Sequence, residues 1–105
     1  MARTFDHVGI PTAVPQAEER FVTKTRVWVT DPQKHPFRVE WLRYESDSSV
    51  SDEMKNNPHV AYKVDSIEEE SKGLTTLIEP FSSVANHRVG FFRTADGVIV
   101  ELMEY

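Results

Sequence analysis

The sequence predicts an α+β fold in which strands dominate and a single helix forms. Runs of β-forming residues of strand length recur along all 105 residues, and turn-forming residues separate most of them. The chain carries one clear helix-start signal, at Ser66. Two short segment types, one with a histidine and one beginning Val-Glu, occur once in each half of the chain. Together these observations favour two related, strand-rich modules.

The first half reads as strands joined by loops. FDHVGI forms a first strand that Pro11 stops, and a loop follows. From about Arg20 the residues are mostly β-formers, which predicts one long strand that ends near Val29. After the loop DPQKHP, alternating residues predict a further strand. Strands are therefore expected at residues 5–10, 20–29 and 37–45.

The second half adds the helix and a terminal hairpin. His59–Val64 reads as a strand, and Ser66 with Glu69 has the form of a helix cap, so that a short helix runs from Ser66 to Lys72 before Gly73. LTTLIE at 74–79 is a strand that Pro80 ends. In the last stretch, 88–105, VGFF and VIVELMEY flank Asp96-Gly97, a dipeptide typical of hairpin turns.

The repeated segments set the expected domain organisation. FDHVGIPT parallels PHVAYKVD, and VEWLRY parallels VELMEY. The polar stretch 47–57 has no apolar period and reads as a linker. We expect a single domain over 1–105, with module 1 at about 1–46 and module 2 at about 58–105.

Composition excludes several classes of function. The net charge of −5, with scattered lysines and arginines, predicts no nucleic-acid partner. No long apolar run is present, so we expect no membrane association and a cytoplasmic protein. Without cysteine, disulfides, thiolate metal sites and cysteine nucleophiles are excluded. Any metal must therefore use imidazole and oxygen ligands.

The repeat selects four polar residues on predicted strands: His7, Glu40, His59 and Glu101. Glu101 is the most unusual of them, because a carboxylate within a strand that is apolar on both faces is costly unless it is paired or bound to a cation. Two imidazoles and two carboxylates suit a divalent metal, namely Zn, Ni, Co, Mn or Fe(II), and leave two positions of an octahedral ion for water or substrate.

A simpler interpretation exists for each residue alone. The histidines would be hydrogen-bonded near strand ends, and Glu40 would pair with Arg38 or Arg43. Glu101 would lie at a solvated edge or pair with an arginine such as Arg88 or Arg93. His35 and His87 lie in loop-like contexts and are expected to be exposed to solvent.

FDHVGI, HVAYKVDSIEE and FRTADGVIVELMEY resemble the vicinal oxygen chelate superfamily, which includes glyoxalase I and methylmalonyl-CoA epimerase. The resemblance is clearest over 57–105 and covers 5–12 and 37–45 more loosely. It implies paired βαβββ modules that form a curled mixed β-sheet cup around a metal, with His7, Glu40, His59 and Glu101 as ligands.

The chain departs from the family pattern in its first module. Too little chain separates His7 from Glu40 for a full helix and three strands, so this module is expected to lack most of its helix and one strand. Sheet surface left uncovered in this way favours a homodimer.

Three functions fit these features. The first is a glyoxalase- or epimerase-like enzyme that acts on a small carbonyl or 2-oxo/2-hydroxy substrate through a metal-stabilised enediolate, with Glu101 or Glu40 as the general base. The second is an Fe(II)-dependent extradiol-type dioxygenase that uses His7, His59 and Glu101. The third is a non-catalytic module whose cup, lined by Trp28, Trp41, Tyr44 and Phe91, binds an apolar small molecule.

Overall fold

The computed structural model describes residues 2–83 and 87–105, which fold into two compact units. The N-terminal unit is His7–Pro58, and the C-terminal unit joins Met1–Asp6 to His59–Tyr105. Strand β1 (Arg3–Pro11) therefore gives its first residues to one unit and its last residues to the other. Neither described α-helix has the length to cross a membrane.

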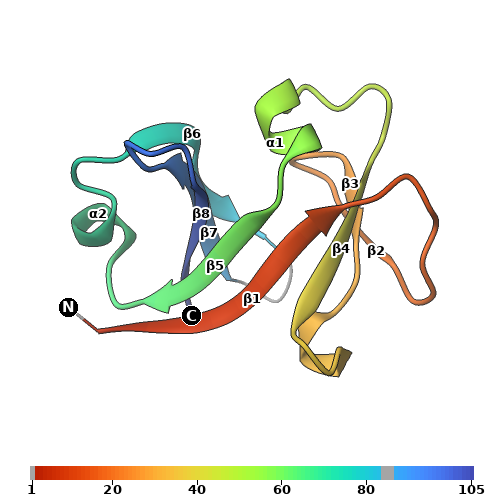
Figure 1. The fold of residues 1–105 in the computed structure, drawn as a ribbon, viewed down its shortest axis with the longest axis horizontal. Coiled ribbons are helices and arrows are strands. Elements are labelled where there is room, and N and C mark those ends of the chain that lie inside the picture. Colours follow the sequence, from red (N-terminus) through yellow and green to blue (C-terminus); the bar gives the residue numbers. More distant parts are fainter. Residues whose placement is uncertain (1, 84–86) are drawn as a thin grey trace. The chain divides into compact units, whose positions relative to one another are not determined.

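The N-terminal unit contains a meander of three strands whose last strand pairs with β1 (Figure 1). The strand order is β2-β3-β4-β1, and the first two pairings are antiparallel while β4 and β1 are parallel. Its other elements are β2 (Arg20–Val22), β3 (Val27–Val29), the 3₁₀ helix η1 (Pro32–Lys34), β4 (Val39–Tyr44) and α1 (Asp52–Asn56).

The C-terminal unit repeats this topology. Its strand order is β6-β7-β8-β5, again with two antiparallel pairings followed by one parallel pairing. Its elements are β5 (His59–Val64), α2 (Ile67–Glu70), β6 (Thr75–Ser82), β7 (Arg88–Arg93) and β8 (Ile99–Glu104). The two units thus share one order of antiparallel and parallel strand pairings.

The long strand predicted from Arg20 to Val29 is wrong, because the structure has two strands there. A turn separates β2 from β3, and they pair with each other so that Phe21 lies opposite Trp28. The turn contains Arg26 at a φ of +50°. Since arginine carries no sequence signal for positive φ, the turn escaped prediction. The first module consequently keeps all four strands, and the expected loss of one strand is also wrong.

The expected loss of the first helix is confirmed. Among the described residues between β1 and β2 there is a loop and no helix. Glu19 holds this loop to β4, because its carboxylate accepts hydrogen bonds from the Arg43 guanidinium at 2.6 and 2.9 Å and from the backbone N–H of Gln16 at 3.2 Å. The hydrogen bond from Arg43 lowers the pKa of Glu19.

The prediction of a single helix is also wrong, because α1 lies inside the expected linker. Ser51 caps it by accepting a hydrogen bond from the backbone N–H of Met54. Met54 is its one buried residue. A helix of five residues is too short to show an apolar period, which is why the pattern of 47–57 predicted none.

Strand β6 continues through Pro80, where the sequence predicted its end. The strand lies at the edge of the sheet order and its pairing with β7 shifts register between Ile78 and Phe81. Proline is tolerated at an edge and at a bulge because no ladder hydrogen bond is lost there. On the neighbouring strand, a β-carbon at Gly90 would lie 3.2 Å from Pro80 Cγ, so the glycine makes room for the proline ring.

The predicted helix near Ser66 is confirmed as α2, and it anchors the apolar core of the C-terminal unit. Ser66 Oγ accepts from the backbone N–H of Glu69 at 3.2 Å. Ile67 is fully buried in a cluster with Val64, Phe92 and Leu102. Because Leu102 is next to Glu101 on β8, this cluster lies on the face of the strand opposite the carboxylate.

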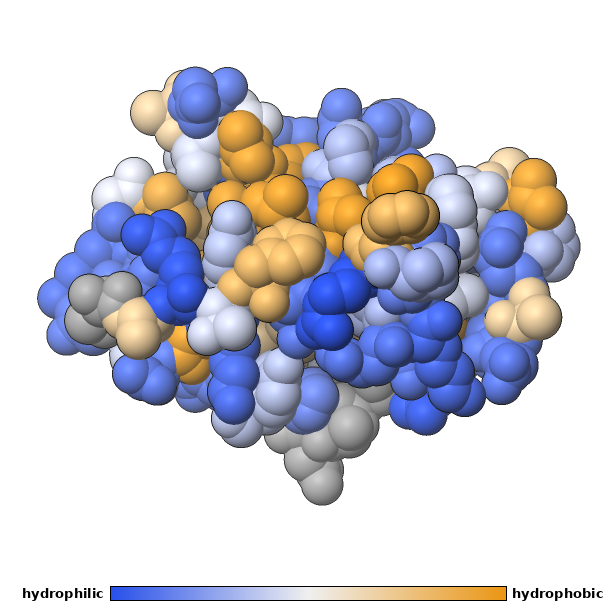
Figure 2. Space-filling view, turned by 60° about the horizontal axis from the view of Figure 1, so that its bottom comes forward, coloured by the Kyte–Doolittle hydropathy of each residue, from blue (hydrophilic) through white to orange (hydrophobic). Residues whose placement is uncertain are grey.

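Several large hydrophobic residues remain exposed. Figure 2 shows hydrophobic side chains at the surface among hydrophilic ones. The exposed set is Phe5, Val14, Phe37, Val98 and Tyr105. The expected homodimer would cover surface of this kind, and it stays a prediction.

We expect Ile67→Ala to destabilise the protein by about 2–5 kcal/mol, because the substitution leaves a cavity in a fully buried site. Urea unfolding followed by circular dichroism measures the change. Val98→Ala is the matched control, since Val98 is exposed and its truncation should change the free energy of unfolding by less than about 0.5 kcal/mol. Equal effects of the two substitutions would contradict the placement of Ile67 in the core.

We expect Glu19→Gln to destabilise the protein in a pH-dependent way. Since the pKa of Glu19 is lowered by Arg43, its carboxylate stabilises the fold above the ordinary glutamate value of about 4.3, and this contribution is lost as the pH falls through the lowered value. The difference from wild type, measured by urea unfolding, should be largest near neutral pH and shrink in acid. Glu79→Gln, on an exposed residue of β6, is the control. A difference that is the same at every pH would refute the role of the ion pair.

Candidate metal-binding residues

The four residues selected by the repeat lie on four strands that the units place in equivalent positions. His7 is on β1, Glu40 on β4, His59 at the start of β5 and Glu101 on β8. His7, His59 and Glu101 are 2%, 3% and 6% exposed, and Glu40 is half-buried. Strand alternation alone put each residue on a face, but only the structure gives their burial.

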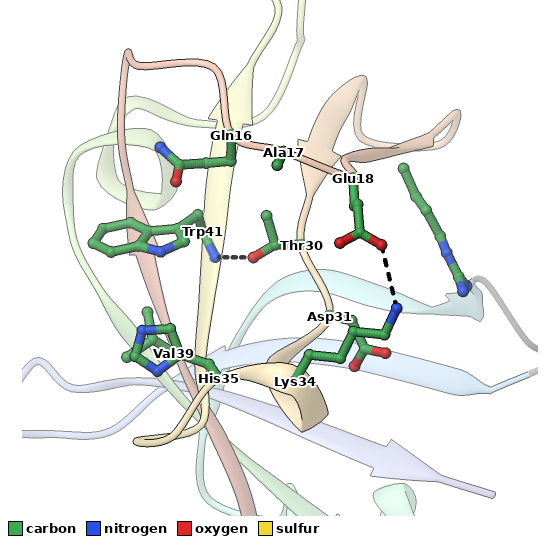
Figure 3. A pocket seen from close by; sticks show the side chains of 10 residues that line it. Gln16, Ala17, Glu18, Thr30, Asp31, Lys34, His35, Val39 and Trp41 are labelled. Carbon is green, nitrogen blue, oxygen red and sulfur yellow. Dashed lines mark hydrogen bonds and ion pairs between the residues drawn. The ribbon is translucent and has the colours of Figure 1, made fainter.

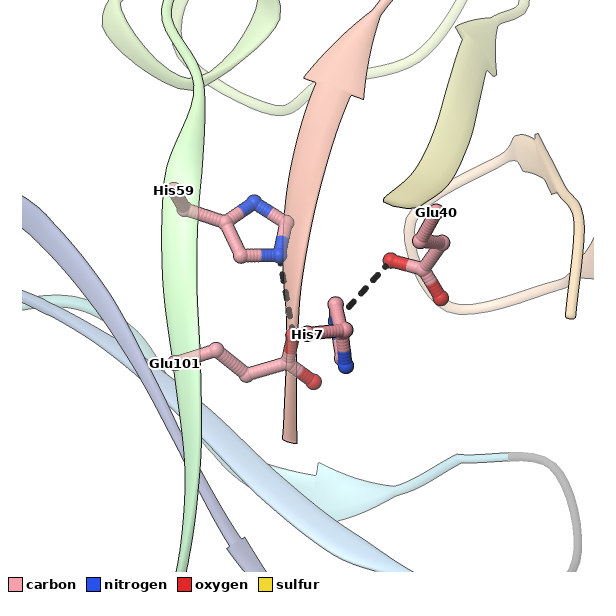
Figure 4. A group of neighbouring side chains, drawn as sticks. All are labelled: His7, Glu40, His59 and Glu101. Carbon is pink, nitrogen blue, oxygen red and sulfur yellow. Dashed lines mark hydrogen bonds and ion pairs between the residues drawn. The ribbon is translucent and has the colours of Figure 1, made fainter. Parts of the chain in front are cut away.

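In the N-terminal unit, His7 and Glu40 form one pair. His7 Nε2 lies 3.3 Å from Glu40 Oε1 (Figure 4). The parallel pairing of β1 and β4 places Glu40 opposite Gly9, two residues after His7. Since residues two apart on a strand point to the same face, the side chains of His7 and Glu40 share that face.

In the C-terminal unit, His59 and Glu101 form the second pair. His59 Nε2 lies 2.9 Å from Glu101 Oε1, and Figure 4 marks this interaction. The parallel pairing of β5 and β8 places Glu101 opposite Ala61, two residues after His59. The ring of Phe91 meets the imidazole of His59 edge-on, with 5.2 Å between ring centroids. Phe91 thus packs against one side of the imidazole.

The same construction therefore occurs twice. In each unit a histidine on the first strand meets a glutamate on the parallel last strand, and the glutamate is in register with the residue two positions after the histidine. An arrangement that arose only from surface ion pairing would not need the same offset in both units. The sequence repeat thus corresponds to a repeat in three dimensions.

The donor atoms of each pair suit a divalent metal. Each residue offers one ligand atom, either an imidazole nitrogen or a carboxylate oxygen, and both are preferred by first-row transition metals. Burying a carboxylate as deeply as Glu101 is costly, and a cation would offset that cost. The residues present therefore fit a metal of the kind predicted from the sequence.

Two of the arginines considered as partners for the glutamates, Arg43 and Arg88, form ion pairs with other carboxylates. Arg43 pairs with Glu19, and Arg88 pairs with Glu68 at 2.6 Å and with Glu104 at 3.3 Å. The hydrogen bond from Arg88 lowers the pKa of Glu68. Glu40 and Glu101 instead lie beside imidazoles.

His35 and His87 are half-buried, so the expectation that both are exposed is wrong. His35 Nδ1 accepts a hydrogen bond from the backbone N–H of Phe37 at 3.0 Å. The His87 ring stacks on Tyr105 with 3.9 Å between centroids. Each histidine has a local structural contact, and neither belongs to a His–Glu pair.

The aromatic residues expected to line a binding cup lie on different faces. In the N-terminal unit, Trp41 points to the face of β4 opposite Glu40, and Trp28 shares that opposite face because it pairs with Arg43. Tyr44 is on the same face as Glu40, and Phe91 contacts His59. The two tryptophans therefore do not share the face of Glu40.

Comparison with known proteins shows the fold. No family model matches the chain, and no curated protein matches it by sequence. Among solved structures, it is similar to a hypothetical protein from Bacillus halodurans, with a TM-score of 0.75 and 19% identity over 100% of this chain and 96% of that one. It is also similar to methylmalonyl-CoA epimerase from Mycobacterium tuberculosis, with a TM-score of 0.63 and 19% identity over 96% of this chain and 87% of that one.

These two likenesses confirm the predicted fold class. The chain has a glyoxalase-like α+β fold with a mixed sheet and few helices, and it spans nearly the full length of both solved structures. At 19% sequence identity, the structural similarity shows the fold and does not identify a substrate.

Proposed function

We propose that the protein is a metal-dependent enzyme of the vicinal oxygen chelate superfamily, of the glyoxalase or epimerase type. The observation that carries the proposal is the repeated His–Glu pair, built in both units by the same parallel strands and the same two-residue offset. The similarity in fold to a methylmalonyl-CoA epimerase supports it. The substrate would be a small molecule with a carbonyl group, or a 2-oxo or 2-hydroxy acid.

In this proposal both pairs hold one divalent cation, with His7, Glu40, His59 and Glu101 as its ligands. The resemblance to the superfamily motifs selects the same four residues. Zn, Ni, Co, Mn and Fe(II) all suit two imidazoles and two carboxylates. When bound, such a cation would supply Lewis-acid chemistry that polarises a substrate carbonyl and makes the adjacent C–H more acidic.

The carboxylate of Glu101 would move the proton. A general base needs an oxygen that takes the proton from carbon and returns it, and Glu101 is the more deeply buried of the two carboxylates. His59 orients it through the 2.9 Å contact at Oε1, and Phe91 packs against one side of the imidazole. Glu40 is half-buried and is the alternative base.

The contact between Glu40 and His7 favours this chemistry over an Fe(II) dioxygenase. A dioxygenase would use His7, His59 and Glu101 and would leave open the position that oxygen needs. Glu40 lies 3.3 Å from His7, in the same register as Glu101 in the other unit, and in this proposal it would fill that position. An acid–base reaction is compatible with a fourth ligand, here the carboxylate of Glu40.

The proposed enzyme would act on a small molecule in the cytoplasm as a homodimer. Exposed hydrophobic residues such as Phe37 supply apolar surface that association would cover. Sedimentation of the protein as a monomer at tens of micromolar would count against the dimer.

We expect the metal-free protein to bind one divalent cation per chain, and His7→Ala and His59→Ala to weaken binding about 10–100-fold or more, since each removes one imidazole ligand. Calorimetric titration with Zn, Ni, Co and Mn salts, after treatment with a chelator, measures both quantities. Circular dichroism checks that each variant is folded.

His35→Ala and His87→Ala are the matched controls, because these histidines lie outside both pairs. They should bind the cation as tightly as wild type. If His59→Ala and His87→Ala behave alike, the four residues are no metal centre. Two cations per chain would instead show that each pair acts alone.

We expect Glu101→Gln to slow proton transfer strongly while changing the shape of the site little. Proton exchange at the carbon beside the carbonyl can be followed by proton NMR in deuterated water, with a panel of 2-oxo acids and 2-methyl-branched acyl thioesters. Loss of a general base should slow exchange by about 10²–10⁴-fold. Exchange at the wild-type rate in Glu101→Gln, with a substrate that wild type accepts, would assign the base to another residue.

A further inference from the structure

The N-terminal unit contains a hollow of about 350 Å³ that is separate from the His7–Glu40 pair. It lies over Val39 and Trp41 of β4, which point to the face opposite Glu40. The loop before β2 and the segment that ends in η1 form its walls. Sites for small molecules occupy about 300–1,000 Å³, so this hollow is large enough for a small ligand.

The missing first helix explains why the hollow exists. In the C-terminal unit, α2 places Ile67 on the equivalent face of the sheet, beside Leu102. In the N-terminal unit, the corresponding connection is the loop that Glu19 holds to Arg43, and Trp41 stays half-exposed beneath it. The position of this loop is fixed by that ion pair, so the hollow is a built feature of the fold.

One side of the hollow is aromatic and apolar. Figure 3 shows Trp41 and His35 on the same side, with Val39 near them. The backbone N–H of Trp41 donates to Thr30 Oγ1 at 2.9 Å, which ties β4 to the end of β3. A flat or branched apolar group would find contact area on these side chains.

The other side carries charges of both signs. Lys34 and Glu18 face each other there, with Asp31 beside them (Figure 3). The Lys34–Glu18 pair is 3.4 Å long and exposed, so it is weak and can open for a ligand. Arg20 also lines the hollow and forms no ion pair within the described part of the chain. Two cationic and two anionic side chains therefore line the hollow.

We propose that this hollow binds a free α-amino acid with an aromatic or large aliphatic side chain. The ammonium group would pair with Asp31 and Glu18, and the carboxylate with Arg20 and Lys34. A ligand with only a carboxylate would lie near the like charges of Asp31 and Glu18. A ligand with only an amine would lie near the like charges of Arg20 and Lys34. A zwitterion satisfies both sets, and its apolar side chain fills the aromatic side.

The test is a titration of the chelator-treated, full-length protein with L-phenylalanine, followed by calorimetry and by tryptophan fluorescence. We expect a dissociation constant on the order of a millimolar, as befits a small ligand in an open site. 3-Phenylpropionate and 2-phenylethylamine, which each lack one charge, should bind about tenfold more weakly. His59→Ala should bind L-phenylalanine normally, which separates this site from the proposed metal centre.

Two pairs of variants locate the site. Arg20→Gln should weaken binding about tenfold, whereas Arg26→Gln, which removes an arginine paired with Asp47 outside the hollow, should not. Trp41→Phe should keep binding but lose the fluorescence change, and Trp28→Phe should keep both.

Three results would overturn the proposal. One is that no binding is detected at an L-phenylalanine concentration about ten times the expected dissociation constant. The second is that Arg20→Gln binds like wild type. The third is that either singly charged analogue binds as tightly as the amino acid.

Discussion

The structure depends on the parallel pairing between the first and last strands of each unit. This pairing brings together residues that are 33 or 42 positions apart and sets the register in which histidine meets glutamate. A shift by one residue would turn each glutamate to the other face, away from its histidine. In the C-terminal unit, helix α2 supports this register by burying the face of β8 opposite Glu101. In the N-terminal unit, the buried residues Val27, Val29 and Leu42 lie on the same face as Glu40. The site residues are therefore consequences of topology, although they look unremarkable in the linear sequence.

The structure brings the four residues selected by the repeat together in two pairs, whereas several elements of the fold differ from the prediction. The repeated segments selected His7, Glu40, His59 and Glu101, and the cost of burying a carboxylate singled out Glu101. The structure pairs them as His7–Glu40 and His59–Glu101. The sequence pattern could not predict burial, because strand alternation shows which face a side chain takes but does not show what covers that face. The non-catalytic alternative grouped Trp41 with Tyr44 in the lining of one cup, whereas the two side chains lie on opposite faces of β4.

The errors in the fold share a physical cause, which is that short-range signals were weak or overridden. The turn at Arg26 uses a positive φ without glycine, and α1 is too short to show a period. Pro80 remains within a strand because an edge and a bulge remove the need for its N–H, and Gly90 leaves room for its ring. By contrast, Ser66 predicted α2 correctly because its side chain caps the helix through a local hydrogen bond.

The most direct test of the central claim is a crystal structure of the metal-loaded protein with anomalous diffraction recorded at the absorption edge of the bound metal. The account predicts one ion per chain with four protein ligands, the imidazoles of His7 and His59 and the carboxylates of Glu40 and Glu101. An ion bound to other residues, or a separate ion at each His–Glu pair, would contradict it.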